Sequence, residues 1–500
     1  MAEQPSPQQI DTEVSAKKAP SELPSRVQKE SRSWKLVPVL LLCLLIGTTA
    51  APEVSAQTQQ KPNIIFILTD DLDTGSIRYM PTVQKQLVEK GTTFENGILT
   101  LTECCPSRVT MLRGQYTHNH TIWSGSLGAR AFRKRGLEQS TVATWLHRAN
   151  YKTALVGKYV NGYDYRYVPP GWDTWHASVG KDVWSECLND NGTKRCYGGK
   201  HPDHVLAEKA EEFIRASRGN AAPLFLWLAF NAPHKPAPYM HQDRNKFSGL
   251  ALPRSPSFNE KNVSDKPTWV KRRDLIGGKQ IKSMRGFYQD RLRSLQAVDR
   301  GVGRLIDALA DTGRLDNTYL VFWTDNGHHM GEHRLGALEG TPGKATPYLE
   351  DTRVPLIVRG PRVPQARRQE LVLNTDIAPT FAELGGTQAA DFVDGRSFAP
   401  LLGGETPLWR TTALIENRKS KKLHRPAYAG LITQDTAYVD YDGPERELYN
   451  LNRDPYQLEN AFAQDPPPDL ARVARLEDRL EELRSCEKDG CKAAEDKAAP

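Results

Sequence analysis

The chain has 500 residues, of which 38% are hydrophobic and 25% are charged, and its formal net charge is +7. This composition describes an ordinary globular protein with ample core-forming residues, and it excludes a chain that is disordered throughout. The length allows two to four domains; the small positive charge suits an anionic substrate, but most of it is expected to be solvated surface.

The first 56 residues have the pattern of a targeting segment. A polar stretch, residues 1–35, ends in basic residues directly before an apolar run at residues 36–46. That run is too short for a comfortable membrane span, and Val-Ser-Ala at residues 54–56 offers a small-residue cleavage site. We therefore predict a signal peptide with a long polar leader over residues 1–56, and a secreted or extracytoplasmic protein. The alternative is an uncleaved N-terminal membrane anchor.

Beyond residue 60 the chain alternates short apolar runs with helical patterns. This rhythm is typical of an α/β fold with a mostly parallel central sheet flanked by helices. Four of the five predicted strands are followed at once by ionisable or metal-ligating residues. Because ligands of open α/β sheets bind beyond the carboxyl ends of the strands, these residues are expected in one cleft. The five strands are predicted at residues 63–68, 153–156, 224–230, 319–323 and 354–358.

Two stretches have the apolar spacing of amphipathic helices. One covers residues 292–311, with Gly313 just past its end, and the other covers residues 469–483. Residues 240–285 are polar, basic and proline-rich, and are expected to form a long excursion near the cleft.

Paired glycines within residues 385–410 indicate a subdomain boundary. The strand-like runs after it fit a small antiparallel sheet with the final helix packed on it, and the charged tail after Cys491 is expected to be disordered. We predict a catalytic domain over residues 57–390, a C-terminal α+β subdomain over residues 391–485, and a polar tail over residues 486–500 with a short disulfide loop. The three runs lie at residues 413–415, 429–433 and 436–441.

Export to an oxidising compartment would allow most of the cysteines to form disulfides. Cys187 and Cys196 flank a short polar loop, and Cys486 and Cys491 flank another, so each pair could close a local disulfide. The adjacent Cys104 and Cys105 are left over, since neighbouring cysteines rarely bridge each other. An unpaired pair in an exported protein calls for a chemical reason.

The stretch Cys104-Cys105-Pro-Ser-Arg108 has the features of an anion-binding helix start. Proline is tolerated in the first turn of a helix and Gly114 is a usual stop, so an amphipathic helix is predicted between them. Backbone N–H groups and the helix dipole favour an anion at Cys104. Arg108, one turn in, adds a guanidinium fork suited to a tetrahedral oxyanion.

Two acidic pairs follow predicted strands. Asp70 and Asp71 come after the first strand, and Asp325 and Asn326 come after the fourth. An isolated Asp-Asp pair is more often a helix cap or a loop salt bridge. With both pairs at strand ends, a divalent cation that relieves their repulsion is the better interpretation. Hard oxygen ligands of this kind suit Ca²⁺, and less well Mg²⁺, but not zinc.

Taken together, and in their order along the chain, these motifs resemble the formylglycine-dependent (type I) sulfatase family. The resemblance implies an alkaline-phosphatase-like fold with a smaller C-terminal antiparallel sheet, and hydrolysis of sulfate esters. It is carried by Asn63-Ile-Ile-Phe with Asp70-Asp71, Cys104 to Arg108, Gly157-Lys158, Ala232-Pro-His234, Thr324-Asp325-Asn326-Gly327, Lys344, Thr375-Asp-Ile-Ala-Pro-Thr and Glu447-Leu-Tyr-Asn-Leu.

The resemblance also implies a role for each site residue. Cys104 would be oxidised by a formylglycine-generating enzyme, and the hydrated aldehyde would be the nucleophile, deprotonated with help from the metal and Asp325. Cations would neutralise the charge on the sulfate oxygens, and His234 or Lys344 would protonate the leaving alkoxide. The implied cations are Arg108, Lys158 and Lys344; the implied metal ligands are Asp70, Asp71, Cys104, Asp325 and Asn326.

One position departs from many sulfatases. Val160 stands where they place a histidine that assists sulfate elimination, so no base is assigned to that step. With Asn161 next, the run resembles the branch of N-acetylglucosamine-6-sulfatases and extracellular heparan endosulfatases. His328, His329 and His333 are expected to be structural or to line the cleft.

The predicted activity is hydrolysis of sulfate monoesters of sulfated sugars, N-acetylglucosamine 6-sulfate being one candidate, or of aryl sulfates. One alternative is a phosphodiesterase or phosphonate monoester hydrolase of the same superfamily. Another is a sulfated-glycan-binding protein without turnover, which holds if Cys104 stays unmodified. Neither a nucleic acid nor a stable membrane partner is expected.

Overall fold

The structure is a computed structural model that describes residues 60–179, 187–336, 343–421 and 424–500. The predicted signal peptide over residues 1–56 lies outside the described residues. Within the described ranges, no helix is both long enough and apolar enough to cross a membrane.

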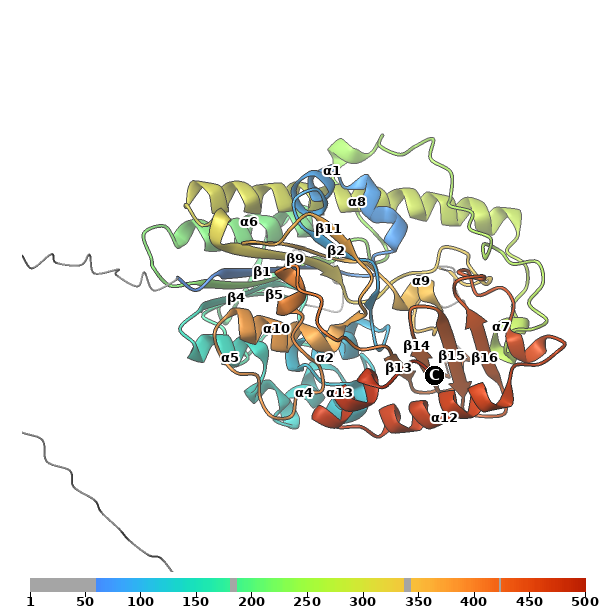
Figure 1. Ribbon diagram of the computed structural model, residues 1–500. Coiled ribbons are helices and arrows are strands. Elements are labelled where there is room, and N and C mark those ends of the chain that lie inside the picture. The colour runs from blue at the N-terminus through green and yellow to red at the C-terminus, as the bar shows by residue number, and fades with distance from the viewer. Residues whose placement is uncertain (1–59, 180–186, 337–342, 422–423) are drawn as a thin grey trace, which may run out of the picture. The chain divides into compact units, whose positions relative to one another are not determined.

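A ten-stranded sheet forms the centre of the described chain (Figure 1). Its middle strand β1 pairs in parallel with β8 on one side and β9 on the other, and β4 and β5 continue the parallel part beyond β8. The remaining neighbours are mainly antiparallel. The sheet order is β11 (Ala366–Arg368), β2 (Thr92–Phe94), β10 (Leu356–Arg359), β9 (Thr318–Thr324), β1 (Asn63–Thr69), β8 (Leu224–Ala229), β4 (Lys152–Gly157), β5 (Thr174–Ser178), β6 (Cys187–Asp190) and β7 (Thr193–Cys196).

The central strands are buried along their whole length. Every residue of β1 and β8 is buried, which explains why both are unbroken apolar runs rather than alternating ones. Phe66 of β1 packs edge-on against Trp227 of β8, with ring centroids 4.7 Å apart. All five predicted strands are present, and their bounds shift by only one or two residues.

Helices cover both faces of this sheet. In Figure 1, α6 (Pro202–Ala216) and α8 (Gly278–Asp311) lie on one face, and α2 (Cys104–Arg113), α5 (Val142–Arg148) and α10 (Ile377–Leu384) lie on the other. The remaining short helices are α1 (Pro81–Val83), α3 (Thr117–His120), α4 (Gly128–Lys134), α7 (Thr268–Lys271), α9 (Leu349–Thr352) and α11 (Ala399–Leu402).

The helix predicted at residues 292–311 is longer than its sequence pattern indicated. It begins at Gly278, inside the stretch that was expected to be an irregular excursion. Met284 and Tyr288 are buried and extend the apolar stripe back by two turns. The charged residues between them hide this stripe in the sequence.

A second, four-stranded antiparallel sheet follows in the chain. Its strands pair in sequence order, and it packs with α12 (Leu470–Arg484) in a hydrophobic cluster of its own. The predicted strands and final helix are present, and a fourth strand, β16, was missed. The strands are β13 (Ala413–Asn417), β14 (Tyr428–Ile432), β15 (Thr436–Tyr441) and β16 (Arg446–Asn450), and a small two-stranded sheet joins β3 (Gly97–Ile98) to β12 (Val372–Leu373).

The prediction of a disordered tail is wrong. Residues after Cys486 form helix α13 (Asp489–Asp496), whose Glu495 is completely buried. The Glu495 carboxylate accepts a 2.6 Å hydrogen bond from Tyr116 and pairs with Arg410 at 2.9 Å. A tail of charged residues therefore docks through a buried ion pair, which composition alone does not reveal.

Both predicted disulfides are formed. Cys187–Cys196 joins strands β6 and β7, and Cys486–Cys491 closes the turn between α12 and α13. Cys104 and Cys105 are free thiols and both are buried.

Candidate functional site

Cys104 is the first residue of helix α2. The helix ends at Arg113, and Gly114 stops it in the left-handed conformation at φ 70°, as its sequence predicted. The expectation of an amphipathic helix is wrong, because all ten residues of α2 are buried. The N-terminal turn, and with it the Cys104 side chain, therefore faces the interior of the site.

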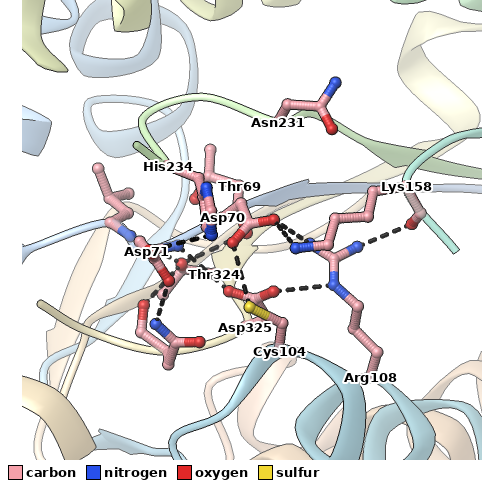
Figure 2. Close-up of polar contacts among 12 residues, drawn as sticks. Thr69, Asp70, Asp71, Cys104, Arg108, Lys158, Asn231, His234, Thr324 and Asp325 are labelled. Atoms are coloured by element: carbon pink, nitrogen blue, oxygen red, sulfur yellow. Dashed lines mark hydrogen bonds and ion pairs between the residues drawn. The ribbon is translucent and has the colours of Figure 1, made fainter. Parts of the chain in front are cut away.

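The first acidic pair lies where β1 ends. Asp70 and Asp71 follow the last residue of the strand, and both side chains are almost fully buried. The Oδ1 atom of Asp70 lies 3.4 Å from the Cys104 sulfur (Figure 2). The central strand and the start of α2 thus bring a carboxylate to the cysteine.

The second acidic pair lies at the end of the neighbouring strand β9. The carboxylate of Asp325 accepts a 3.2 Å hydrogen bond from the backbone N–H of Asp71, and the Asn326 amide donates a 2.6 Å hydrogen bond to the Asp71 carboxylate. Parallel pairing of β1 with β9 ends with Thr69 opposite Thr324, so the two pairs must meet.

Three cations surround these carboxylates. Arg108 donates from Nε to Asp325 at 2.8 Å, and Lys158 pairs with Asp70. Lys344 pairs with Asp71 and also lies 2.8 Å from the Cys104 sulfur. Figure 2 shows Arg108 and Lys158 side by side on one flank of the carboxylates.

His234 is the most accessible member of the group. Its side chain is 29% exposed, and Nε2 lies 3.8 Å from the Asp71 carboxylate. The turn after β8 carries it, and its Nδ1 lies 2.7 Å from the Lys235 carbonyl oxygen. The structure thus brings together all the residues predicted for the site; their chemical roles stay predictions.

The charges around the site shift its carboxyl groups in opposite directions. Burial alone would raise the pKa of Asp71, but Lys344 and His234 outweigh it and hold the pKa well below its usual range. Burial and the nearby Asp70 raise the pKa of Asp325. Burial also raises the pKa of Cys104, as do Asp325 and Asp70.

The same residues fit a divalent cation. One ligand atom each from Asp70, Asp71, Cys104 and His234 lies within 4.8 Å of the others. The Oδ1 atom of Asn326 is buried and has no hydrogen-bond partner, so an acceptor is left for a cation. Mostly oxygen donors, two of them carboxylates that would otherwise repel each other, suit a hard cation.

Two more buried residues lie near the site: His328, which was expected to be structural or to line the cleft, and Arg291, which was missed from the sequence. His328 lies 4.0 Å from the Asp71 carboxylate, and neither ring nitrogen has a hydrogen-bond partner. Arg291 of α8 donates to the Asp71 carbonyl at 2.5 Å and pairs with Asp73 at 2.9 Å. An arginine within an apolar helical stripe was the available signal for the second residue.

Comparison with known families decides the membership of this chain. A family model described as Sulfatase matches residues 62–387. The chain belongs to the sulfatase family. A second model, described as the C-terminal part of N-sulphoglucosamine sulphohydrolase, matches residues 341–486 of this sulfatase.

Named sulfatases are similar to it over most of its length. It is 34% identical over 407 residues to an extracellular sulfatase Sulf-1 homologue of Caenorhabditis elegans, covering 77% of this chain and 56% of that relative. It is 28% identical over 506 residues to N-acetylglucosamine-6-sulfatase of Homo sapiens, covering 91% of this chain and 90% of that relative. The chain thus spans about half the length of the nematode relative.

A solved structure shares the fold. A protein described in complex with its substrate D-glucosamine-2-N,6-O-disulfate matches with a TM-score of 0.74 over 88% of this chain and 100% of that chain, at 22% identity. The predicted alkaline-phosphatase-like fold and the predicted membership of a family of sulfate-ester hydrolases are confirmed.

Proposed function

We propose that this sulfatase hydrolyses sulfate monoesters of sulfated sugars, with 6-sulfated N-acetylglucosamine as its preferred substrate class. The observation that carries the proposal is the position of Cys104. Cys104 is the first residue of helix α2. Its sulfur lies 3.4 Å from the Asp70 carboxylate and 2.8 Å from the Lys344 ammonium. The relatives with the names N-acetylglucosamine-6-sulfatase and extracellular sulfatase support the choice of sugar sulfates.

Two groups absent from the chain as synthesised complete the proposal. Cys104 would be converted to formylglycine, whose hydrated aldehyde would supply an oxygen nucleophile, and a cation, Ca²⁺ rather than Mg²⁺, would offset the negative charge of the carboxylates. The cation would be held by Asp70, Asp71, Asp325 and Asn326, together with the side chain at position 104.

The chain's own cations would bind the sulfate group. Arg108 and Lys158 lie on one flank of Cys104 in Figure 2, and the Lys344 ammonium lies 2.8 Å from the Cys104 sulfur, so a sulfate ester brought to position 104 would meet all three cations. Each is held by a carboxylate, so the positive charge is fixed before substrate binds and needs little rearrangement.

Protonation of the leaving sugar oxygen is proposed for His234. Its side chain is the most exposed of the site, so a bound sugar could reach it, and imidazole is a common general acid. Lys344 is the alternative donor. The side chain at Val160 cannot accept a proton, so we assign no base for the final elimination of sulfate.

Several wider features belong to the same proposal. We expect the protein to be exported by residues 1–56 and to meet a formylglycine-generating enzyme during maturation. The proposed catalytic domain covers residues 57–390, the α+β subdomain residues 391–485, and the tail residues 486–500.

A substrate screen tests the proposal. N-acetylglucosamine 6-sulfate, a generic aryl sulfate and an aryl phosphodiester would each be offered to the purified enzyme, and kcat/KM compared. We expect the sugar sulfate to be turned over best and the aryl phosphodiester least. A higher kcat/KM for the diester would contradict the proposal in favour of a phosphodiesterase.

Removal of the cation is expected to destabilise the protein as well as inactivate it. Dialysis against a chelator would remove the ion that links the oxygen ligands of β1 and β9 and offsets the repulsion between Asp70, Asp71 and Asp325, so the melting temperature should fall and Ca²⁺ should restore it. At a concentration of about 100 times its Kd, a bound ion adds about 2.7 kcal/mol to the free energy of unfolding. Calorimetric melting measures this without reference to turnover.

The matched control is Asp71→Asn, in which Ca²⁺ should shift the melting temperature far less. Oxygen ligands from several elements suit the larger, more flexible coordination shell of Ca²⁺. Restoration by Mg²⁺ at lower concentrations than Ca²⁺ would contradict the choice of metal.

A further inference from the structure

Arg425 is a buried cation that has no ion-pair partner among the described residues. Three arginines are among the largest fully buried side chains of the described residues: Arg108, Arg291 and Arg425. Arg108 pairs with Asp325 at 2.8 Å, and Arg291 pairs with Asp73 at 2.9 Å. Arg425 forms no ion pair with any carboxylate in the described ranges. An unpaired buried cation costs several kcal/mol, so its retention calls for an anion from elsewhere.

The guanidinium of Arg425 is held in place by neutral groups. Its two terminal nitrogens donate to the carbonyl oxygens of Pro426, at 2.6 Å, and Arg418, at 2.9 Å. Its Nε is buried and has no hydrogen-bond partner. Burial lowers the pKa of Arg425, although Tyr428 and Tyr441 oppose this. The guanidinium also lies over the ring of Tyr428, 4.8 Å from its centroid, so its direction is fixed by neutral groups and no carboxylate within the described residues pairs with its charge.

Arg425 lines a pocket of about 580 Å³ whose other charged walls are mostly basic. Arg272, Lys419 and Lys421 are exposed there. The one carboxylate among the described lining residues is Glu445, which already accepts hydrogen bonds from the backbone N–H and the hydroxyl of Thr268, at 2.7 and 2.6 Å. The pocket is therefore suited to an anion.

The pocket shares no residue with the catalytic group. It is lined by residues 419–421 and 424–426, which lie between β13 and β14, by α7 with Arg272 directly after it, and by Glu445; α7 lies beside the four-stranded sheet in Figure 1. The Glu416 N–H of β13 donates to the carbonyl oxygen of Thr100, four residues before Cys104, at 2.9 Å. The ring of Tyr428, over which the guanidinium of Arg425 lies, belongs to the neighbouring strand β14. A group bound at Arg425 would thus lie beside the part of the four-stranded sheet to which the segment before Cys104 is hydrogen-bonded.

We propose that the pocket around Arg425, Lys419 and Lys421 binds a second sulfate group of the substrate, one carried by a sugar that neighbours the sulfate ester under attack. A sulfate matches the fixed guanidinium fork, and exposed lysines at the rim add charge without demanding one geometry. The inference rests on the proposed sugar sulfatase function and makes a multiply sulfated glycan chain, rather than a monosaccharide, the favoured substrate.

Binding is tested separately from turnover. A heparin-derived tetrasaccharide would be titrated by calorimetry into the full chain carrying Cys104→Ala. This variant is expected to fold but not to turn over substrate, so the titration measures binding alone. Adding Lys419→Ser with Lys421→Ser should weaken binding about tenfold, which corresponds to about 1.4 kcal/mol for the two exposed contacts together. Because both lysines are exposed, this variant should fold. Arg425→Gln should weaken binding at least as much, with melting temperature recorded as its folding check.

The matched control is Lys85→Ser with Lys90→Ser, the same charge change in and just after the helical turn Gln84–Val88, where no residue lines the pocket. It should bind the tetrasaccharide as tightly as the parent. In the active enzyme, the Lys419 and Lys421 changes should raise KM for the tetrasaccharide far more than KM for a small aryl sulfate.

Equal binding by the double lysine variant and its control would overturn the inference, and so would equally tight binding of the tetrasaccharide after its sulfates are removed. Neither result depends on turnover. If the wild-type enzyme hydrolyses no sulfate ester while the lysine changes still weaken binding, the proposed function fails and the second sulfate site stands.

Discussion

Replacing Cys104 with alanine is expected to abolish sulfate-ester turnover, whereas replacing Cys105 with alanine should spare most of it. Cys104 lies between Asp70 and Lys344, while Cys105 packs into the hydrophobic core and is 1% exposed. Loss of a nucleophile lowers kcat by about 10³-fold or more. Loss of the Cys105 sulfur should cost only about 1 kcal/mol of stability, through a small cavity. Turnover of an aryl sulfate by the two variants measures the difference.

Peptide mass spectrometry across residues 97–108 provides the control. In active wild-type protein the aldehyde should be found at position 104 and an unmodified thiol at position 105. An aldehyde at Cys105 would shift the register of the whole site by one residue. An unmodified Cys104 in a preparation that turns over sulfate esters would remove formylglycine from the mechanism.

The parts of the site that follow strands were predictable from the sequence. Unbroken apolar runs identify β1 and β9, and polar residues follow each run directly, so Asp70 and Asp325 could be placed at one edge of a parallel sheet. Cys104 was predictable for a different reason, since proline and glycine fix where its helix begins and ends.

Lys344 could not be placed from local pattern. It lies in a segment without regular structure, and its contacts with Asp71 and Cys104 are distant in sequence. Only its position in the order of family motifs pointed to it. The supporting Arg291 was missed for a related reason, because a charge in a helical stripe looks like surface until the partner strand ends are known.

The Arg425 pocket could not be predicted from the net charge of the chain, because the net charge does not show which basic residues the fold buries. The net charge of +7 was expected to be mostly solvated surface, and most basic residues fit that description. The basic stretch between β13 and β14 differs because the fold buries one of its arginines away from any described carboxylate. Burial, rather than the number of charges, marks this stretch as a binding site.

Breaking the buried ion pairs that hold the C-terminal helix α13 is expected to lower the free energy of unfolding substantially. Arg410 donates to Asp376 at 2.7 Å and pairs with Glu495 at 2.9 Å, and all three side chains are fully buried. Arg410→Met removes the ion-pair partner of Asp376 and leaves Glu495 with Arg396, at 3.1 Å, as its ion-pair partner among the described residues. Breaking a buried pair in this way costs about 3–5 kcal/mol. The midpoint of urea unfolding, compared with wild type at pH 7, measures the loss.

The pH dependence of this variant separates lost charge from lost packing. Burial already raises the pKa of Glu495 while Arg410 opposes that rise, so removing Arg410 should raise the pKa further. A carboxyl group whose pKa is higher in the folded state than in the unfolded state gains stability as pH falls, because the folded state takes up the proton. The deficit of Arg410→Met should therefore shrink between pH 7 and pH 5. A deficit that is independent of pH would mean that packing of the arginine side chain, rather than its charge, holds α13 in place.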